Sequence, residues 1–290
     1  MSRPSLVILA AGRARRFGGV KPLAPIGAHG EAVIDLIAGD AIHAGFDKIV
    51  LVINPDTGPL IQDHVSLVWP KSVNVDFAIQ ERPMGTVHAV LAAQHLIDHS
   101  APFAVSNADD LYGAEAFRAL AAHLIGVGTN ALVGFRLSNA LVGDEPVTRG
   151  VCEVGGNHLD GIAERRHVVA VEDRFESHDG LTPKVLDPAA LVSMNLWGFA
   201  PAMWTIFDDA MSAATDASEE AEVLLPEVIG RVVSGDLAVG DQALRDITVL
   251  ATDSRCVGVT HPGDLSVVQS DIAKQIERGE RPTRPFDERT

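Results

Sequence analysis

A cluster of basic residues near the start of the chain is the first feature whose residue types and spacing could do chemistry. Arg13, Arg15, Arg16 and Lys21 follow closely on the small-residue turn 10–12 (Ala-Ala-Gly). Small residues let backbone N–H groups approach an anion, and cationic side chains add charge that suits a polyphosphate. The cluster stands out because the whole chain has a formal net charge of −16. The pattern indicates a site for a highly charged anion; a surface loop with solvated arginines is the alternative.

The element that must position this cluster is an apolar run at 6–9 (LVIL), which has the length and composition of a buried parallel strand. A dinucleotide-binding loop is a poor match. Gly12, Gly18 and Gly19 do not have the G-x-G-x-x-G spacing, and Pro22 follows where the helix of that motif would run.

Two adjacent aspartates, Asp109 and Asp110, follow a second strand-like run at 102–106. Ligands of open parallel sheets gather at the carboxyl ends of the strands, and carboxylate oxygens are ligands that Mg²⁺ prefers. Adjacent side chains at a strand end point apart, so we expect only one of the two to bind a metal directly. Capping of the helix that follows is the alternative role for the pair.

A third motif, 80–86 (QERPMGT), precedes an alanine-rich helix expected at 87–95. The amide of Gln80 can donate and accept hydrogen bonds at once, which suits the imide edge of a pyrimidine. Gly85 would let a flat ring approach the backbone closely. An ordinary turn at the start of a helix is the alternative interpretation.

Together these motifs resemble the signature of the sugar-phosphate nucleotidyltransferases, the NDP-sugar pyrophosphorylases. That signature is roughly L-A-A-G-x-G-x-R-F/M, a short gap, and K-P. Arg16 and Lys21 match its arginine and lysine, whereas Ala14 stands where a second glycine is usual. The resemblance covers about 6–279 and is closest to the hexose-1-phosphate enzymes that use UTP or dTTP. It implies that a nucleotidyl group passes from UTP or dTTP to a sugar 1-phosphate, with Mg²⁺ as cofactor and pyrophosphate as the second product.

The resemblance also implies a role for each matching residue. Arg16, Lys21 and Asp109 are expected to be catalytic, with Asp109 as the metal ligand. The residues expected to bind the nucleotide are Ala10, Ala11, Gly12, Arg13, Gln80, Pro83, Gly85, Thr86 and Asp110. The residues expected to bind the sugar phosphate are Gly150, Glu164 and Asn195. Gly258 stands where many relatives carry a second metal-binding aspartate, which leaves Asp253 as a weak candidate for that ligand.

The order of strand-like and helix-like segments predicts an α/β fold with a mostly parallel sheet. The resemblance makes it a Rossmann-like, GT-A-like nucleotidyltransferase sheet flanked by helices, with a small antiparallel sugar-binding region. We expect one domain over 1–280, with a nucleotide half at about 1–135 and a sugar-binding half at about 136–280. The segment 167–184 is expected to be a flexible lobe or lid, and 281–290 a loose tail. Further helices are expected over 31–45, 201–213, 219–233 and 264–278.

Composition and charge limit the classes of function. The chain is 47% hydrophobic and 21% charged, which is ordinary for a globular protein. It has no apolar run approaching the ~20 residues of a membrane helix, and no signal-peptide pattern, so we expect a cytoplasmic protein that does not bind membranes. A pI near 5.0 argues against nucleic-acid binding. Cys152 and Cys256 are expected to be buried free thiols. The sequence leaves the assembly state open, a homo-oligomer included.

Two other classes of function remain open. A glycosyltransferase of related fold would use Asp109 and Asp110 to hold the metal of an NDP-sugar, and would release no pyrophosphate. A non-catalytic sensor of nucleotides or sugar phosphates would bind ligand without pyrophosphate exchange.

Overall fold

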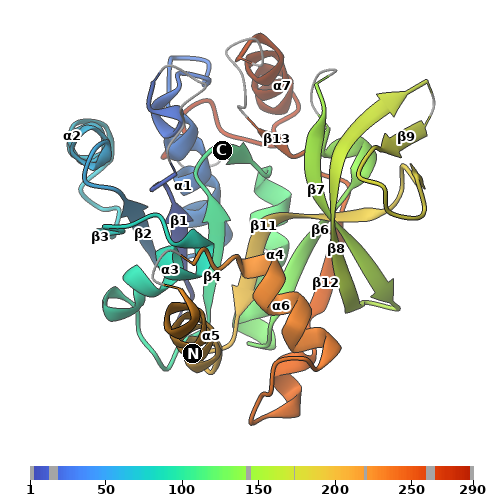
Figure 1. Ribbon diagram of the computed structural model, residues 1–290. Coiled ribbons are helices and arrows are strands. Elements are labelled where there is room, and N and C mark those ends of the chain that lie inside the picture. The colour runs from blue at the N-terminus through green and yellow to red at the C-terminus, as the bar shows by residue number, and fades with distance from the viewer. Residues whose placement is uncertain are drawn as a thin grey trace.

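The computed structural model describes residues 3–12, 19–141, 145–172, 174–218, 221–258 and 265–287. Its centre is a mixed sheet of eleven strands with helices on both faces (Figure 1). The strands of this sheet are β1 (Ser5–Leu9), β2 (Lys48–Ile53), β3 (Val75–Ile79), β4 (Phe103–Asn107), β6 (Ala131–Arg136), β7 (Val147–Gly155), β8 (His158–Val171), β9 (Arg174–Ser177), β10 (Val185–Leu186), β11 (Leu191–Phe199) and β12 (Thr248–Thr252). A separate pair is formed by β5 (Asp110–Leu111) and β13 (Val257–Gly258).

The strand order is β10-β9-β8-β12-β6-β11-β4-β1-β2-β3, with β7 paired to β11 and β8. Strands β4, β1, β2 and β3 are parallel to one another, and β12 is parallel to β6. Strand β11 runs antiparallel to both β4 and β6 and joins the two halves of the sheet. The predicted α/β fold is confirmed, and its antiparallel part is larger than the small region expected.

The α-helices form two layers. Helices α1 (Val33–Ala44), α2 (Gly58–Val68), α4 (Ala114–Gly126) and α7 (Leu265–Glu277) contribute to one apolar core. Helices α3 (Gly85–Ala92), α5 (Met203–Ala217) and α6 (Leu225–Ser234) contribute to the other. Short 3₁₀ turns are η1 (Lys21–Leu23), η2 (Gln94–Leu96), η3 (Leu137–Asn139) and η4 (Gln242–Arg245).

The parallel strands are continuously apolar because the sheet is covered on both faces. In β1, Leu6 and Ile8 point into the core beneath α1, whereas Val7 points into the core beneath α3. All three side chains are fully buried. Such burial on both faces requires an unbroken apolar run, and it brings the carboxyl ends of β1, β3 and β4 to one edge of the sheet.

The segment 167–184, expected to be a flexible lobe, belongs in its described part to an antiparallel arm of strands β7 to β10 (Figure 1). Arg165 of β8 donates to Asp179 at 2.8 Å and to the carbonyls of Leu181 and Pro183. Arg165 and Asp179 are each only 5% exposed. A buried polar cluster, in place of an apolar repeat, gives the described part of this segment a defined structure, and its flexibility stays a prediction.

The expected loose tail packs, as far as residue 287, against α1. The Arg281 guanidinium lies 2.5 Å from the Asp40 carboxylate, and both side chains are almost fully buried. The ring of Phe286 lies 5.5 Å from that of Trp69. At Gly39 an added Cβ would lie 2.3 Å from the carbonyl oxygen of Pro285. The tail expectation was therefore wrong.

Several element boundaries differ from expectation. Helix α6 begins at Leu225 and not at 219, with Pro226 in its first turn. Helix α2 was not expected at all. The start predicted for the last helix, Asp264, lies outside the described residues, and α7 is described from Leu265. Cys152 and Cys256 are buried free thiols, as predicted. None of the described helices has the length and apolar character needed to cross a membrane.

Candidate active site

Three of the predicted motifs meet at the carboxyl edge of the parallel strands. Leu9 at the end of β1 is in register with Asn107 at the end of β4. Backbone hydrogen bonds continue past the strand ends, from Ala10 N to the carbonyl of Val52 and from Gln80 N to the carbonyl of Ile53, each at 2.8 Å. The edge therefore presents the 10–12 turn, the Gln80 motif and the aspartate pair together.

Lys21 reaches the aspartate pair from η1. Its Nζ lies 3.5 Å from Oδ2 of Asp109, and the two side chains are 16% and 38% exposed. The pair joins residues that are 88 positions apart in the chain. The other basic residues of the cluster, Arg13, Arg15 and Arg16, lie outside the described residues, as does Ala14.

Three cavities converge on Asp109, which lines all of them. The nucleotide-side cavity, about 520 Å³, is lined by six of the residues predicted to bind the nucleotide: Ala11, Gly12, Gln80, Pro83, Gly85 and Thr86. A small cavity of about 160 Å³ contains Lys21, Ala10 and Gly12. The acceptor-side cavity, about 380 Å³, contains Gly150, Glu164 and Asn195. Among the described residues, the predicted sites thus surround one position.

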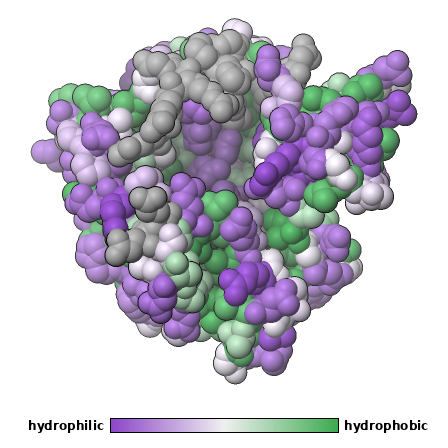
Figure 2. Space-filling view, viewed as in Figure 1, coloured by the Kyte–Doolittle hydropathy of each residue, from purple (hydrophilic) through white to green (hydrophobic). Residues whose placement is uncertain are grey.

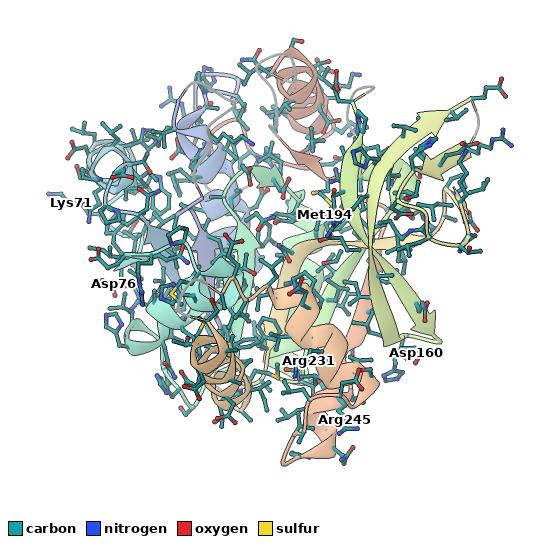
Figure 3. All side chains as sticks on the ribbon, viewed as in Figure 1. Lys71, Asp76, Asp160, Met194, Arg231 and Arg245 are labelled. Atoms are coloured by element: carbon teal, nitrogen blue, oxygen red, sulfur yellow. The ribbon has the colours of Figure 1, made fainter. Side chains whose placement is uncertain are left out.

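Figure 2 shows a hollow on the face viewed, with hydrophilic residues inside it. Met194, which lines the acceptor-side cavity, is labelled in Figure 3 between the strands of the nucleotide half and the β7–β8 arm. The acceptor-side cavity therefore opens between the two parts of the sheet that β11 connects.

The Gln80 amide has a fixed orientation. Its Nε2 donates to the carbonyl of Gly85 at 3.0 Å and to Nδ1 of His88 at 3.1 Å. A carbonyl can only accept, so the nitrogen must face Gly85. Burial, followed by the charge of Arg82, lowers the pKa of His88 and favours the neutral ring that accepts this bond. Because both amide N–H groups have protein partners, Gln80 offers its carbonyl alone as a hydrogen-bonding group to a ligand.

Gly85 has a backbone requirement in addition to the ligand approach that was predicted for it. Its φ is +89°, and an added Cβ would lie 2.3 Å from the carbonyl oxygen of Val223. Val223 N donates to the Met84 carbonyl, and Val87 N donates to the Val223 carbonyl. The hydroxyl of Thr86 also accepts a hydrogen bond, from Leu225 N at 2.8 Å. The close approach at Gly85 is therefore to the protein's own backbone, which attaches α3 to the segment before α6.

Asn195 lies at an irregularity of β11 and has a φ of 61°. Its Oδ1 accepts from Trp197 Nε1 at 3.1 Å, and its Nδ2 donates to Oδ1 of Asn107 at 3.4 Å. Nδ2 of Asn107 in turn donates to Asp110 at 2.8 Å. The polar side chain within an apolar strand is thus satisfied, and it connects the acceptor-side cavity to the aspartate pair.

The two aspartates have different environments. Removal from water, followed by the nearby charge of Asp109, raises the pKa of Asp110 from its ordinary value of 3.8 to about 6. The hydroxyl of Tyr112 donates to the Met194 carbonyl and accepts from Asn107 N, each at 2.9 Å. These bonds hold the loop that follows β4 in place. A cation beside the pair would relieve the repulsion that disfavours the ionised form of Asp110.

Of the positions considered as metal ligands, only Asp109 and Asp110 place carboxylate oxygens at this site. Gly258 is in register with Asp110 on β13 and lines the acceptor-side cavity, but it has no side-chain oxygen. Asp253 accepts from Arg136 at 2.5 Å and lines a different cavity from Asp109, so its candidacy as a second ligand was wrong. The described residues contain no group of three or more His, Cys, Asp or Glu placed to hold a metal.

The motif analysis missed several residues of the site. Arg149 lines the acceptor-side cavity, Glu222 lines the nucleotide-side cavity, and His88 and Asn107 orient neighbouring side chains. Arg149 carried a usable signal, since a basic residue directly precedes the predicted Gly150 in an acidic chain. The other three carried none that distinguishes them from ordinary helix, loop or strand residues.

An α/β sheet with a small-residue turn, a lysine–aspartate pair and two flanking cavities at its carboxyl edge defines a nucleotidyltransferase class of protein. Comparison with known families supports this classification. The chain belongs to the MobA-like NTP transferase domain family, whose model matches residues 6–151.

Individual relatives are more distant. The chain is 29% identical over 174 residues to the bifunctional protein GlmU of Rhodopseudomonas palustris (strain BisB5); the match covers 59% of this chain and 36% of GlmU. The chain thus spans little more than a third of that relative's length.

Two solved structures share the fold. The inositol-1-phosphate CTP transferase of T. maritima has a TM-score of 0.67 at 15% identity, covering 95% of this chain and 97% of that one. A UDP-glucose pyrophosphorylase complexed with UDP-glucose has a TM-score of 0.63 at 17% identity, covering 94% and 100%.

Proposed function

We propose that the protein transfers a nucleotidyl group from a nucleoside triphosphate, UTP or dTTP, to a sugar 1-phosphate, with release of pyrophosphate. One observation carries this proposal: Asp109, which Lys21 approaches from a third, small cavity, lines both the cavity of the Gln80 motif and the cavity of Gly150, Glu164 and Asn195. A reaction that joins two phosphorylated molecules needs two cavities and a charged group between them.

The chemistry follows from the charges of the reactants. An oxygen of the acceptor's phosphate attacks the α-phosphorus of the triphosphate. The bond from that phosphorus to the bridging oxygen breaks, and pyrophosphate leaves with the bonding electrons. Both reactants are anions, so the main obstacle is their repulsion. Lys21 supplies positive charge between them, the N–H groups of Ala11 and Gly12 bind phosphate oxygens, and Arg16 adds charge from the same motif.

Asp109 would hold Mg²⁺, with Asp110 in support. Such a cation, when bound, supplies charge stabilisation for the triphosphate and the departing pyrophosphate. The two neighbouring carboxylates fit this role, because they repel each other in its absence. Removal of divalent cations with EDTA should abolish turnover and should leave the fold intact.

The preference for a uracil or thymine base rests on Gln80 and the cavity around it. With both N–H groups engaged, the Gln80 carbonyl would accept from N3–H of either base. This differs from the paired donor and acceptor expected from the sequence, because Gln80 would not donate to the base. A comparison of different nucleoside triphosphates therefore tests the preference for a uracil or thymine base most directly.

A pyrophosphate-release assay tests the proposal. Five nucleoside triphosphates are combined with a panel of hexose 1-phosphates and myo-inositol 1-phosphate, with Mg²⁺ or with EDTA. We expect Mg²⁺-dependent release of pyrophosphate with UTP or dTTP and at least one sugar 1-phosphate. Consumption of an NDP-sugar without pyrophosphate would favour a glycosyltransferase. Nucleotide binding without pyrophosphate release or exchange would favour a sensor.

A further inference from the structure

The lining of the acceptor-side cavity is mostly acidic, and two of its carboxylates are paired from outside the lining, Glu164 with Arg166 at 2.8 Å and Asp109 with Lys21 at 3.5 Å. Among the described residues that line it, Arg149 is the one cationic side chain. The acidic residues of its lining are Asp109, Asp110, Glu145, Glu164 and Glu227. If a phosphorylated acceptor binds here, its dianionic group must avoid most of this wall. These five acidic residues, the acidic wall of the cavity, therefore limit where the phosphate can bind. They also limit the negative charge that the rest of the acceptor can have.

Arg149 has a fixed position and spare donors. Its Nε and Nη2 donate to the carbonyl of Ala140 at 3.0 and 2.7 Å, and its Nη1 donates to the carbonyl of Thr148 at 2.8 Å. These bonds use three of the five N–H groups of a guanidinium. The other two, one on each terminal nitrogen, have no partner in the described part of the chain. A half-buried guanidinium held in this way is preorganised to bind an anion.

Arg149 lines the same cavity as Asp109 and Asp110. Burial and Asp109 raise the pKa of Asp110 on balance, and the charge of Arg149 partly opposes this rise. Burial lowers the pKa of Arg149 on balance, and the charge of Asp110 partly opposes this fall. The two side chains nevertheless do not form an ion pair among those found in the described residues. Arg149 is thus close to the aspartate pair, where the acceptor's phosphate must meet the triphosphate, and no carboxylate has taken its free N–H groups.

The other arginine beside a predicted acceptor residue does not serve this role. Arg165 follows Glu164 directly but is absent from the lining of the cavity. The guanidinium of Arg165 donates its hydrogen bonds to Asp179 and to the carbonyls of Leu181 and Pro183. A phosphate could recruit it only by breaking this buried cluster.

We infer that Arg149 binds the phosphate of the acceptor, and that the acidic wall limits acceptors to molecules whose only negative charge is that phosphate. The inference rests on the proposed function, because it assigns this cavity to the acceptor. Hydroxyl groups can donate to Glu145, Glu164 and Glu227, whereas a second carboxylate would meet like charges. Neutral hexose and polyol phosphates fit this description, and uronic acid phosphates do not.

A binding experiment tests Arg149 independently of turnover. Inorganic phosphate is titrated into wild-type protein, Arg149→Gln and Arg149→Lys by isothermal titration calorimetry in EDTA. The matched control is Arg174→Gln, an exposed arginine of the same arm that lines none of the three cavities. We expect Arg149→Gln to weaken phosphate binding about 10- to 100-fold, the scale for losing hydrogen bonds from a charged group, with a partial loss in Arg149→Lys. Unchanged binding by Arg149→Gln, or no binding by the wild type, would overturn the assignment.

A matched pair of sugars tests the limit on charge. Glucose 1-phosphate and glucuronic acid 1-phosphate differ in having CH₂OH or carboxylate at C6, and each is used to displace inorganic phosphate from the wild-type protein. We expect glucuronic acid 1-phosphate to bind at least about 10-fold more weakly, since its second negative charge meets the carboxylates of a partly buried site. Equal displacement by the two sugars would contradict the limit.

Turnover then separates the two proposals. If pyrophosphate release is observed, Arg149→Gln should raise the KM for the acceptor and leave the KM for the triphosphate within about 2-fold. An equal rise in both would assign Arg149 to the triphosphate and overturn the inference. If no triphosphate and acceptor give pyrophosphate while phosphate binding depends on Arg149, the proposed function fails and the anion site remains.

Discussion

At the scale of single residues, the site depends on two opposite charges that neither strand nor helix forces together. Lys21 and Asp109 approach to 3.5 Å while both keep some exposure to solvent. An exposed pair of this kind contributes little to folding stability, about 0 to 1 kcal/mol. Folding stability therefore gives little reason for its placement, whereas the proposed reaction needs a charged pair at this position.

The first prediction concerns this pair. Lys21→Ala and Asp109→Ala should each reduce turnover at least about 10²-fold, because each removes an oriented electrostatic group from the reacting centre. Neither should lower the free energy of unfolding by more than about 1 kcal/mol. Pyrophosphate release and urea denaturation measure the two effects. Lys71→Ala, an exposed lysine that points away from the body in Figure 3, is the control and should match wild type. Near-normal release by either folded variant would refute the assignment.

The second prediction concerns Asp110, whose pKa is raised to about 6 in the folded protein. An acid with a raised folded pKa binds its proton more tightly when folded. It therefore destabilises the protein at neutral pH, and this cost is relieved as pH falls through about 6. Asp110→Asn should raise the free energy of unfolding at pH 7.5 in EDTA by roughly 1 to 3 kcal/mol.

The difference between Asp110→Asn and wild type should shrink as the pH is lowered from 7.5 to 5, because wild-type Asp110 then becomes neutral. Comparing the two proteins at each pH cancels the contributions of all other titrating groups. Urea denaturation in EDTA at both pH values measures the difference. A difference that stays constant or grows on acidification would contradict the prediction.

At the scale of elements, the nucleotide-side cavity depends on a junction between α3 and the segment that leads into α6. Gly85 has a positive φ and lies against the backbone of Val223, whose N–H and carbonyl both bond to the turn at the start of α3. A Cβ at Gly85 cannot be accommodated by rotating a side chain, since the atoms that it would meet are backbone.

The third prediction follows from this junction. Gly85→Ala should lower the free energy of unfolding by about 2 to 5 kcal/mol, through the strained φ and the clash with Val223. If activity is observed, it should also raise the KM for the triphosphate. Gly126→Ala is the matched control, because Gly126 ends α4 with no atom within 4 Å of an added Cβ. That change should alter stability by less than about 1 kcal/mol. Equal effects of the two substitutions would show that the junction is unimportant.

At the scale of the whole molecule, the last described segment joins the end of the chain to α1. The Arg281–Asp40 pair is separated by 241 residues in sequence and is almost fully buried. Breaking a buried pair leaves an uncompensated charge in the interior, which usually costs more than the intact pair contributes.

The fourth prediction tests this attachment. Arg281→Ala should lower the free energy of unfolding by about 3 to 5 kcal/mol. Arg284→Ala, an exposed arginine of the same segment, should change it by less than about 0.5 kcal/mol. Both are measured by urea denaturation with equal m-values. A small effect of Arg281→Ala would mean that the tail is held by its apolar contacts, chiefly Phe286 on Trp69.

Local sequence determined the elements that build the nucleotide half. The apolar runs of β1, β2 and β4 and the glycine after α1 specify strands and a helix end through the residues they contain, so they were predictable. The meeting of the 10–12 turn, Gln80 and Asp109 was also predictable, because the carboxyl ends of parallel strands share one edge. Arg16 and Arg13 stay predictions, since they lie outside the described residues.

The features that the sequence did not predict depend on contacts between residues far apart in the chain. No local sequence pattern indicates such contacts. Arg165 forms a buried polar cluster in an arm for which no packing was predicted, and Arg281 attaches to α1 a tail that was expected to be loose. The backbone of Val223 requires a glycine at position 85, which the sequence had related to a ligand alone. Arg149 became part of the acceptor-side cavity only when β7, β8 and β11 brought its neighbours together. Sequence patterns report the burial of apolar faces. Buried polar pairs and single close approaches depend on which segments the fold brings together, and only the tertiary structure determines that.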